Sequence, residues 1–169
     1  MARVMVSGTC GELTGDMIKR FGPDVTRHKP GSVVILGGTN DLGWNISPSE
    51  IMRNLKELYD KTREVGGVPV PVTVPSIRVE DAIQSREGMG WLNEHLERRH
   101  QLNGSIQEYA SAHSLAYVDL FTATTDVNSG QLAAQYSNDG LHLTTDGYRL
   151  FALLVAQVLN PLLRQRAPS

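Results

Sequence analysis

The sequence has almost no cysteine, no strong excess of either charge and no long apolar run. Its single cysteine, Cys10, excludes an intrachain disulfide. The 16 basic and 18 acidic residues give a formal net charge of -2, which argues against a nucleic-acid or anionic-membrane partner because either would favour a basic surface. No apolar run approaches the ~20 residues of a membrane-spanning helix. We therefore expect neither a nucleic acid nor a membrane as a partner.

Sequence signals for metals, cofactors and secretion are also missing. The cysteine and the five histidines form no cluster with metal-ligand spacing, and residues 94–100 lack the His-Glu-x-x-His pattern of zinc proteases. We therefore expect no metal and no cofactor. Residues 1–6 are too short for a signal peptide, so a cytoplasmic location is the simplest expectation.

The length and composition of the chain fit one soluble domain. Its 169 residues are 40% hydrophobic and 20% charged, as in ordinary globular proteins. A domain of this size buries roughly two-thirds of its unfolded surface, so its core needs no disulfide or metal to support it. No internal repeat and no low-complexity tract divides the sequence. We expect a single domain over residues 1–169.

Short apolar runs alternate with segments of helical periodicity along the chain. The periodic segments predict helices over residues 14–28, 47–66, 91–112 and 144–163. The apolar runs predict strands at residues 4–6, 32–36, 68–74 and 115–120. Pro69 and Pro71 lack ladder donors, so the third strand is expected to be short, bulged or near a sheet edge. The alternation predicts an α/β fold with a parallel sheet covered by helices on both faces.

Asp139 and His142 lie three positions apart in a glycine-containing turn, just before the last predicted helix. At this spacing the carboxylate can hold the imidazole by one nitrogen and leave the other free to take a proton, as a general base does. The alternative is a surface Asp-Gly turn with an incidental histidine. Structural roles, through caps or loop hydrogen bonds, are expected for Asp16 and Asp41. The other histidines lie on helical segments and are expected to be solvated or partly packed: His28, His95, His100 and His113.

Two more polar segments directly follow predicted strands, at residues 8–11 and 37–41. Because the carboxyl ends of parallel strands meet at one sheet edge, both segments should lie where such folds carry their chemistry. There the Asn40 amide can donate to a developing oxyanion, and Gly11 can offer its backbone N–H ahead of the helix that begins at Thr14. The alternatives are ordinary turns, with Asn40 capping its own loop.

These segments together resemble the SGNH-hydrolase superfamily, also called GDSL esterases and lipases. The matching blocks, in the family's order, are Gly11-Glu12-Leu13-Thr14-Gly15-Asp16-Met17 through Phe21, Gly38-Thr39-Asn40-Asp41 and Asp139-Gly140-Leu141-His142. The resemblance extends over nearly the whole chain, from about Val4 to the final helix. It implies a three-layer α/β/α, flavodoxin-like fold with a mainly parallel sheet.

The resemblance also implies a function and a set of site residues. The implied reaction is hydrolysis of a carboxylic ester through an acyl-enzyme, without a metal or cofactor. His142 is the implied general base and Asp139 its orienting acid, while Gly11 and Asn40 are the implied oxyanion-hole donors. Small, soluble acyl esters are the expected substrates, and the loop at residues 75–90 is expected to line the acyl pocket.

The chain departs from the family where the nucleophile belongs. The family pattern begins with a strand that leads into Gly-Asp-Ser, and no Gly-Asp-Ser occurs in this sequence. The chain starts close to the second block, so we expect an N-terminally truncated domain whose sheet lacks the first strand. Loss of that strand would expose sheet edges and apolar helix faces.

Three explanations of this departure make different predictions. A second copy of the chain could replace the strand, giving a homodimer with exchanged elements. Residues 4–6 could instead occupy the central slot, which would place Ser7 or Cys10 as the nucleophile. The ordinary roles of these two residues are a turn serine and a buried apolar filler. Finally, the protein could be a catalytically inactive relative that keeps a binding pocket but no nucleophile.

Overall fold

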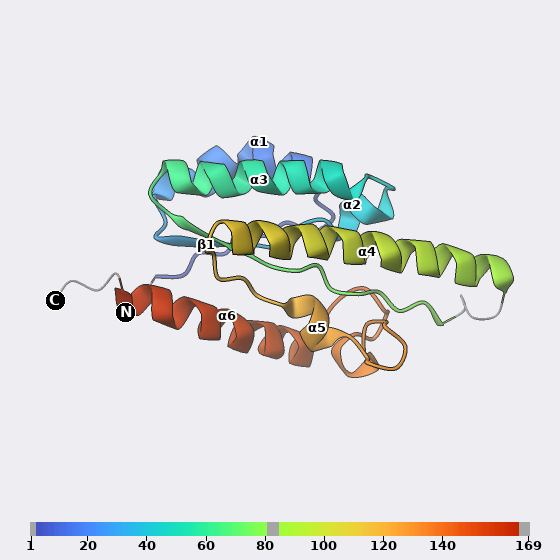
Figure 1. The fold of residues 1–169 in the computed structure, drawn as a ribbon. Helices are drawn as coiled ribbons and strands as arrows, with labels where there is room; N and C mark the ends of the chain where they lie inside the picture. Colours follow the sequence, from blue (N-terminus) through green and yellow to red (C-terminus); the bar gives the residue numbers. More distant parts are fainter. Residues whose placement is uncertain (1–2, 81–84, 166–169) are drawn as a thin grey trace.

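Two parallel strands form the sheet in the computed structural model of the protein (Figure 1). Strand β1 covers Ser32–Ile35 and strand β2 covers Val68–Pro71, and the two pair residue for residue along their whole length. Valine and isoleucine dominate β1, which suits a strand buried on both faces. The structure describes residues 3–80 and 85–165. Within them, the predicted parallel pairing is confirmed.

Helices flank the strands along the chain. The longer ones are α1 at Thr14–Asp24, α3 at Pro48–Glu64, α4 at Arg86–Ala112 and α6 at Thr145–Gln165. The shorter ones are α2 at Thr39–Gly43, α5 at Leu120–Thr124, and the 3-10 turns η1 at Thr26–His28 and η3 at Ala134–Tyr136. The four predicted helices are confirmed, although α4 begins earlier than expected because the Ser85 hydroxyl caps it, accepting from Gly88 N–H at 2.9 Å. The loop predicted at residues 75–90 therefore ends at Ser85, and its residues 81–84 lie outside the described part.

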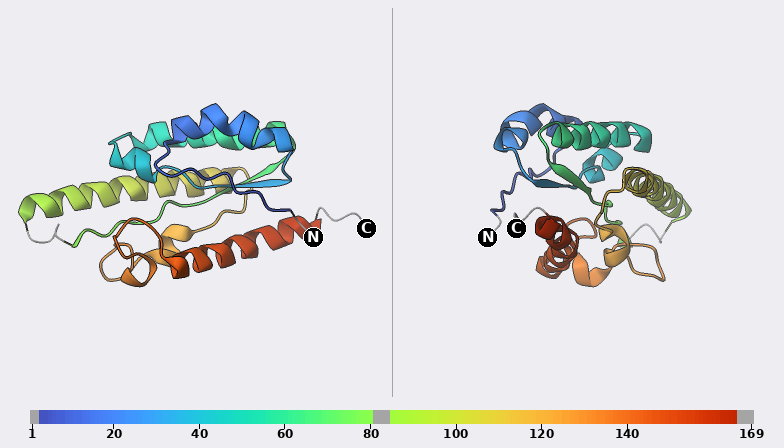
Figure 2. Two further views of the ribbon diagram at one scale, coloured as in Figure 1. Left: turned by 180° about the vertical axis from the view of Figure 1, so that it is seen from behind. Right: turned by 60° about the vertical axis from the view of Figure 1, so that its left-hand side comes forward.

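The helices cover both faces of the sheet, so the fold has three layers (Figures 1 and 2). On one face, Ile35 of β1 packs into a core with α1, α3 and α4, whose buried residues include Phe21, Ile51, Leu55, Leu58, Leu102 and Ile106. On the other face, Val70 of β2 packs with the apolar side of α6, which includes Phe151, Leu154, Val155 and Val158. Each fully buried aliphatic side chain contributes ~1.5–3 kcal/mol of stability. The predicted three-layer α/β/α architecture is confirmed.

The prolines of β2 explain why the sheet is narrow. Val68 N–H donates to Gly31 O at 3.0 Å and Val72 N–H donates to Ile35 O at 3.1 Å. Because donors alternate along a strand, the nitrogens of Pro69 and Pro71 face the opposite side, where they have no hydrogen to donate. On that side Val118 donates to Pro71 O at 2.9 Å and accepts from Thr73 N–H at 3.0 Å, and it forms only an isolated bridge. β2 is short, as predicted. The strand predicted at residues 115–120 is reduced to this bridge.

Residues 3–13 form neither helix nor strand. Val4 and Val6 are 83% and 91% exposed, so the strand predicted at residues 4–6 is wrong, and this segment occupies no slot in the sheet. Without a hydrogen-bonded partner strand, three apolar residues gain too little burial to offset the cost of ordering their backbone. No described residue pairs with the outer edge of β1.

Candidate functional site

The turn at residues 137–142 brings the predicted acid and base together. Oδ2 of Asp139 accepts from Nδ1 of His142 at 2.7 Å, which leaves Nε2 as the ring nitrogen that can take a proton. Oδ1 of Asp139 accepts from the backbone N–H groups of His142 (2.8 Å) and Leu141 (2.9 Å), and from the Ser137 hydroxyl (3.2 Å). The predicted spacing therefore produces a carboxylate–imidazole pair held in one orientation.

The hydrogen bonds of this turn also set the charge of its carboxylate. The bond from the His142 side chain is the largest cause, followed by the backbone N–H groups, and together they hold the pKa of Asp139 well below its ordinary value. The carboxylate therefore stays ionised around neutral pH and can stabilise an imidazolium on His142. Because the two side chains are 56% and 68% exposed, the pair orients the ring more than it stabilises the fold.

Arg78, which belongs to no sequence motif, clamps the loop that precedes this turn. Its guanidinium donates to the carbonyls of Leu132 (3.3 Å) and Ser137 (2.9 Å), and its backbone N–H donates to Gly140 O at 2.8 Å. Gly140 has a φ of +78°, and a Cβ there would lie 1.9 Å from Arg78 O, so only glycine fits. Arg78 lies 59 residues before Ser137, and its position soon after a predicted strand is the only sequence signal for this role.

The two predicted oxyanion-hole residues lie on segments that are bonded to each other. Asn40 is in the first turn of α2, behind Gly38 with its φ of +118°, and its Nδ2 donates to Glu12 O at 2.9 Å. Glu12 directly follows Gly11, whose φ of +73° suits glycine. Gly11 N–H donates to no protein acceptor in the described part of the chain. The role of both groups as oxyanion donors stays a prediction.

A buried carboxylate fixes α2 against the start of α1. Asp41 is fully buried and accepts from Thr14 twice, from its N–H at 3.1 Å and from its hydroxyl at 2.5 Å. Leu13, the N-cap residue of α1, provides no side-chain cap, so Asp41 supplies that contact from 27 residues away. The structural role expected for Asp41 is confirmed. The same contact holds the Asn40 turn beside the start of α1.

Neither candidate nucleophile is bonded to the Asp139–His142 pair. Ser7 Oγ accepts from Nη1 of Arg20 at 2.8 Å, and Arg20 also forms a two-pronged ion pair with Glu12. The bond to Glu12, more than any other contact, raises the pKa of Arg20, so the group beside Ser7 is a permanent cation rather than a base. Cys10 is free and exposed, not a buried filler. Within the described residues, neither Ser7 nor Cys10 has a hydrogen bond to His142.

The remaining polar groups differ from the sequence expectations at His95, which was expected to be solvated or partly packed and is buried. Asp16 pairs with Lys19 at 2.7 Å in the first turns of α1. Three of the other histidines are exposed and one is buried: His28, His100 and His113 are exposed, and His95 is buried. Among the residues that the structure describes, no group of three or more histidines, cysteines and carboxylates could hold a metal. No helix in that part of the chain combines the length and apolar character needed to cross a membrane.

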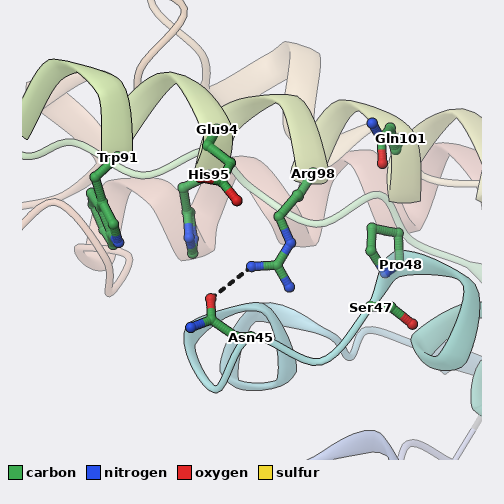
Figure 3. Close-up of a pocket in the computed structure, with 8 residues that line it drawn as sticks. All are labelled: Asn45, Ser47, Pro48, Trp91, Glu94, His95, Arg98 and Gln101. Atoms are coloured by element: carbon green, nitrogen blue, oxygen red, sulfur yellow. Dashed lines mark hydrogen bonds between the residues drawn. The ribbon is translucent and has the colours of Figure 1, made fainter. Parts of the chain in front are cut away.

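Two surface hollows accompany these groups. One, of about 320 Å³, is lined by Arg78, Val79, Glu80, Asn138 and Asp139. The other, of about 490 Å³, lies between α4 and the segment that joins α2 to α3 (Figure 3). Neither His142 nor Asn40 lines either hollow. The structure thus assembles the acid–base pair and the Gly11–Asn40 region, but neither hollow spans the two.

Sequence comparison gives a match to one protein family. The model of the GDSL-like lipase/acylhydrolase family matches residues 1–150. A comparison with curated proteins gave no match.

Several solved structures share the fold. A GDSL-like lipase from Bacteroides thetaiotaomicron has a TM-score of 0.78 and 23% identity, with 89% of this chain and 72% of that chain covered. A lipase/acylhydrolase from Enterococcus faecalis has a TM-score of 0.67 and 27% identity over 87% and 70%. An acetylxylan esterase from Geobacillus stearothermophilus has a TM-score of 0.65 and 18% identity over 88% and 68%.

Proposed function

The chain belongs to the GDSL-like lipase/acylhydrolase family, and we propose that it hydrolyses carboxylic esters through an acyl-enzyme intermediate. The observation that carries this proposal is the 2.7 Å bond from His142 Nδ1 to Asp139, in the turn that resembles the family's acid–base block. An imidazole oriented in this way has one nitrogen anchored and one available for proton transfer.

The proposed reaction has two steps. In the first, the nucleophile attacks the ester carbonyl carbon while Nε2 of His142 takes its proton, and the ionised Asp139 stabilises the imidazolium. Gly11 N–H and the Asn40 amide would hold the oxyanion, a contribution of ~3 kcal/mol per donor in enzymes where it is measured. The alcohol leaves with the proton from His142. In the second step, water attacks the acyl-enzyme by the same route and releases the acid.

Ser7 is the first candidate for the nucleophile. Ser7 lies four residues before Gly11 in the chain, on the same segment without regular structure. To attack a carbonyl it would have to exchange its bond from Arg20 for one to His142. Two alternatives remain proposals: attack by Cys10, and a homodimer in which a second copy completes the sheet and the site.

A short acyl group on a small, soluble alcohol is the substrate class that we propose. The Geobacillus relative is an acetylxylan esterase, which acts on an acetyl ester. The exposed Asp139–His142 turn likewise lies open to small esters.

Turnover of p-nitrophenyl acetate by the purified protein tests the proposal. We expect the His142→Ala variant to lose a factor of about 10²–10⁴ in kcat because it lacks the general base. The His28→Ala variant removes an exposed histidine that is far from His142 in the sequence, and it should keep the wild-type rate. Equal rates for the wild-type and His142→Ala proteins would refute the hydrolase proposal.

A second candidate function is ligand binding without catalysis. It is favoured by the missing Gly-Asp-Ser and by the engagement of Ser7 Oγ with Arg20. Labelling with a fluorophosphonate, followed by peptide mass spectrometry, separates the two functions. An adduct on Ser7 supports the hydrolase, whereas a folded protein without any adduct supports the binding role. A cysteine-directed reagent tests Cys10 in the same way.

A further inference from the structure

The larger hollow, which we call the α4 groove, lies under the N-terminal half of α4. Its walls include Trp91, Glu94, His95 and Arg98 from α4, opposite Asn45 and Ser47 from the segment that joins α2 to α3. Figure 3 shows Trp91, His95 and Arg98 pointing down from α4 towards that segment. The groove measures about 490 Å³, within the range of small-molecule sites.

One wall of the groove comes directly after α2, the short helix that carries Asn40. The N–H of Trp44 donates to Asn40 O at 3.0 Å at the end of α2, and Asn45 follows it directly. Arg98 fastens this segment to α4 by donating to Asn45 Oδ1 (2.8 Å) and Ile46 O (2.6 Å). This wall of the groove is therefore held between the end of α2 and Arg98 of α4.

An exposed aromatic surface dominates one wall of the groove. Trp91 is 51% exposed, and its ring stacks on His95 with centroids 5.0 Å apart and planes 21° apart. Burial, with smaller effects from Arg99 and Arg98, lowers the pKa of His95 to about 4, so the stacked ring is neutral at physiological pH. Because His95 is buried and Trp91 is half-exposed, the stacked pair presents the ring of Trp91 to water as a flat apolar face rather than a charged one.

Polar groups that border this face can both donate and accept hydrogen bonds. The exposed carboxylate of Glu94 can accept a hydrogen bond. The side-chain amide of Asn45 accepts from Arg98 through its Oδ1, and its Nδ2 can donate to a ligand. A bound anion is disfavoured because the charges of Glu94 and Arg98 balance in the lining, and Arg98 already donates to Asn45 and Ile46. A long acyl chain is disfavoured because most of the lining is polar. A flat apolar face bordered by both donors and acceptors suits a ligand with an apolar ring face and equatorial hydroxyls.

We propose that the α4 groove binds the sugar ring of a saccharide, which stacks on Trp91 and hydrogen-bonds with Glu94 and Asn45. Saccharide binding at this groove needs no catalysis. Its further role, holding the alcohol part of an acylated saccharide during hydrolysis, rests on the proposed function.

Direct binding measurements test the groove by itself. The chain has two tryptophans, so in the Trp44→Phe variant Trp91 is the sole tryptophan reporter. We expect a saturable fluorescence change with cellobiose, xylobiose or maltose, and none with mannitol, which has hydroxyls but no ring face. Calorimetry should show the same binding to the wild-type and Trp44→Phe proteins, weaker binding to Trp91→Phe, and affinity at least about tenfold lower for Trp91→Ala. No saturable signal with any of the three saccharides would overturn the proposal, as would unchanged binding to a folded Trp91→Ala protein.

Kinetics separate the groove from the catalytic proposal. We compare kcat/KM for 6-O-acetylglucose, an acetyl ester that keeps its ring hydroxyls, with that for p-nitrophenyl acetate. The Trp91→Ala change should lower the ratio of the two values by about tenfold, whereas Trp44→Phe should leave it unchanged. Saccharide binding without any turnover would refute the hydrolase proposal and leave the saccharide-binding proposal standing. Turnover with an unchanged ratio in Trp91→Ala would refute the role of the groove in substrate binding and leave the hydrolase proposal standing.

Discussion

The two halves of the candidate site are held together in different ways. Asp139 and His142 are bonded across one turn, three residues apart, and their geometry is largely local. Asn40 instead bonds to Glu12, which lies 28 residues earlier on a segment with no helix or strand. The first half therefore keeps its internal geometry as long as its turn forms. The second half needs the packing of α2 against α1.

The anchors behind the two halves also differ in burial. The half around Asn40 depends on Asp41, which is fully buried and bonded to Thr14. The half around His142 depends on Arg78, whose side chain is 16% exposed and which binds backbone carbonyls. A buried charged group is costly to disturb, because its partners lose hydrogen bonds that water cannot replace. Substitutions should therefore affect stability at one half and activity at the other.

Among the residues that position the turn, Gly140 should have the largest effect on activity when it is replaced. A Cβ at this position would lie 1.9 Å from Arg78 O, so the Gly140→Ala turn must move, and a displacement of about 1 Å can cost about 10² in kcat/KM. The matched control is Gly130→Ala, since Gly130 also has a positive φ (+69°) but has open space around it. The measurement is p-nitrophenyl acetate hydrolysis. Equal losses in the two variants would contradict the proposed importance of this turn.

Replacement of Asp41 should have the largest effect on stability. Asp41→Ala leaves the N–H and hydroxyl of Thr14 without their buried acceptor, at a cost of about 3 kcal/mol in the free energy of unfolding. For a chain of this length, that corresponds to a fall of roughly 6–12 °C in Tm. Urea unfolding measures the cost, with the exposed Asp16→Ala as control. If Asp41→Ala lost no more free energy of unfolding than Asp16→Ala, the half around Asn40 would not depend on a buried anchor.

Replacement of Arg78 should reduce turnover more than substrate binding. Arg78→Met removes the donors to Leu132 and Ser137, so we expect kcat to fall about tenfold with little change in KM. Arg78→Lys keeps a charge but not the fork, and should recover only part of the loss. A rise in KM at constant kcat would instead assign Arg78 to ligand binding in the smaller hollow.

The pH dependence of stability should show the smallest effect, outside both halves. The folded pKa of His95, about 4, lies below its ordinary value of 6.5, so the unfolded state binds more protons between these values. Stability should therefore fall as the pH falls from 6.5 towards 4. His95→Phe keeps the stacking on Trp91 and should flatten this part of the Tm–pH curve. If His95→Phe kept the wild-type slope of Tm against pH, groups other than His95 would cause the loss of stability at low pH.

Much of the fold could be predicted because its signals are local. Ser47 accepts from Glu50 N–H at 3.2 Å and caps α3, at the position where the helix over residues 47–66 was predicted to begin. The parallel sheet follows from the alternation of helical and apolar segments. The prediction of a strand at residues 4–6 failed because strand formation depends on a partner, and no local pattern reveals whether a partner is present.

By itself, the sequence determined the four longer helices, the parallel pairing of β1 with β2 and the spacing that joins Asp139 to His142. Each depends on residues a few positions apart or on a simple periodicity. Tertiary structure alone decided that Arg78 holds the turn, that Asp41 caps α1 and that the segment around Val118 forms only a bridge. Those contacts join residues tens of positions apart, and their geometry exists only once the layers have packed and fixed which groups meet.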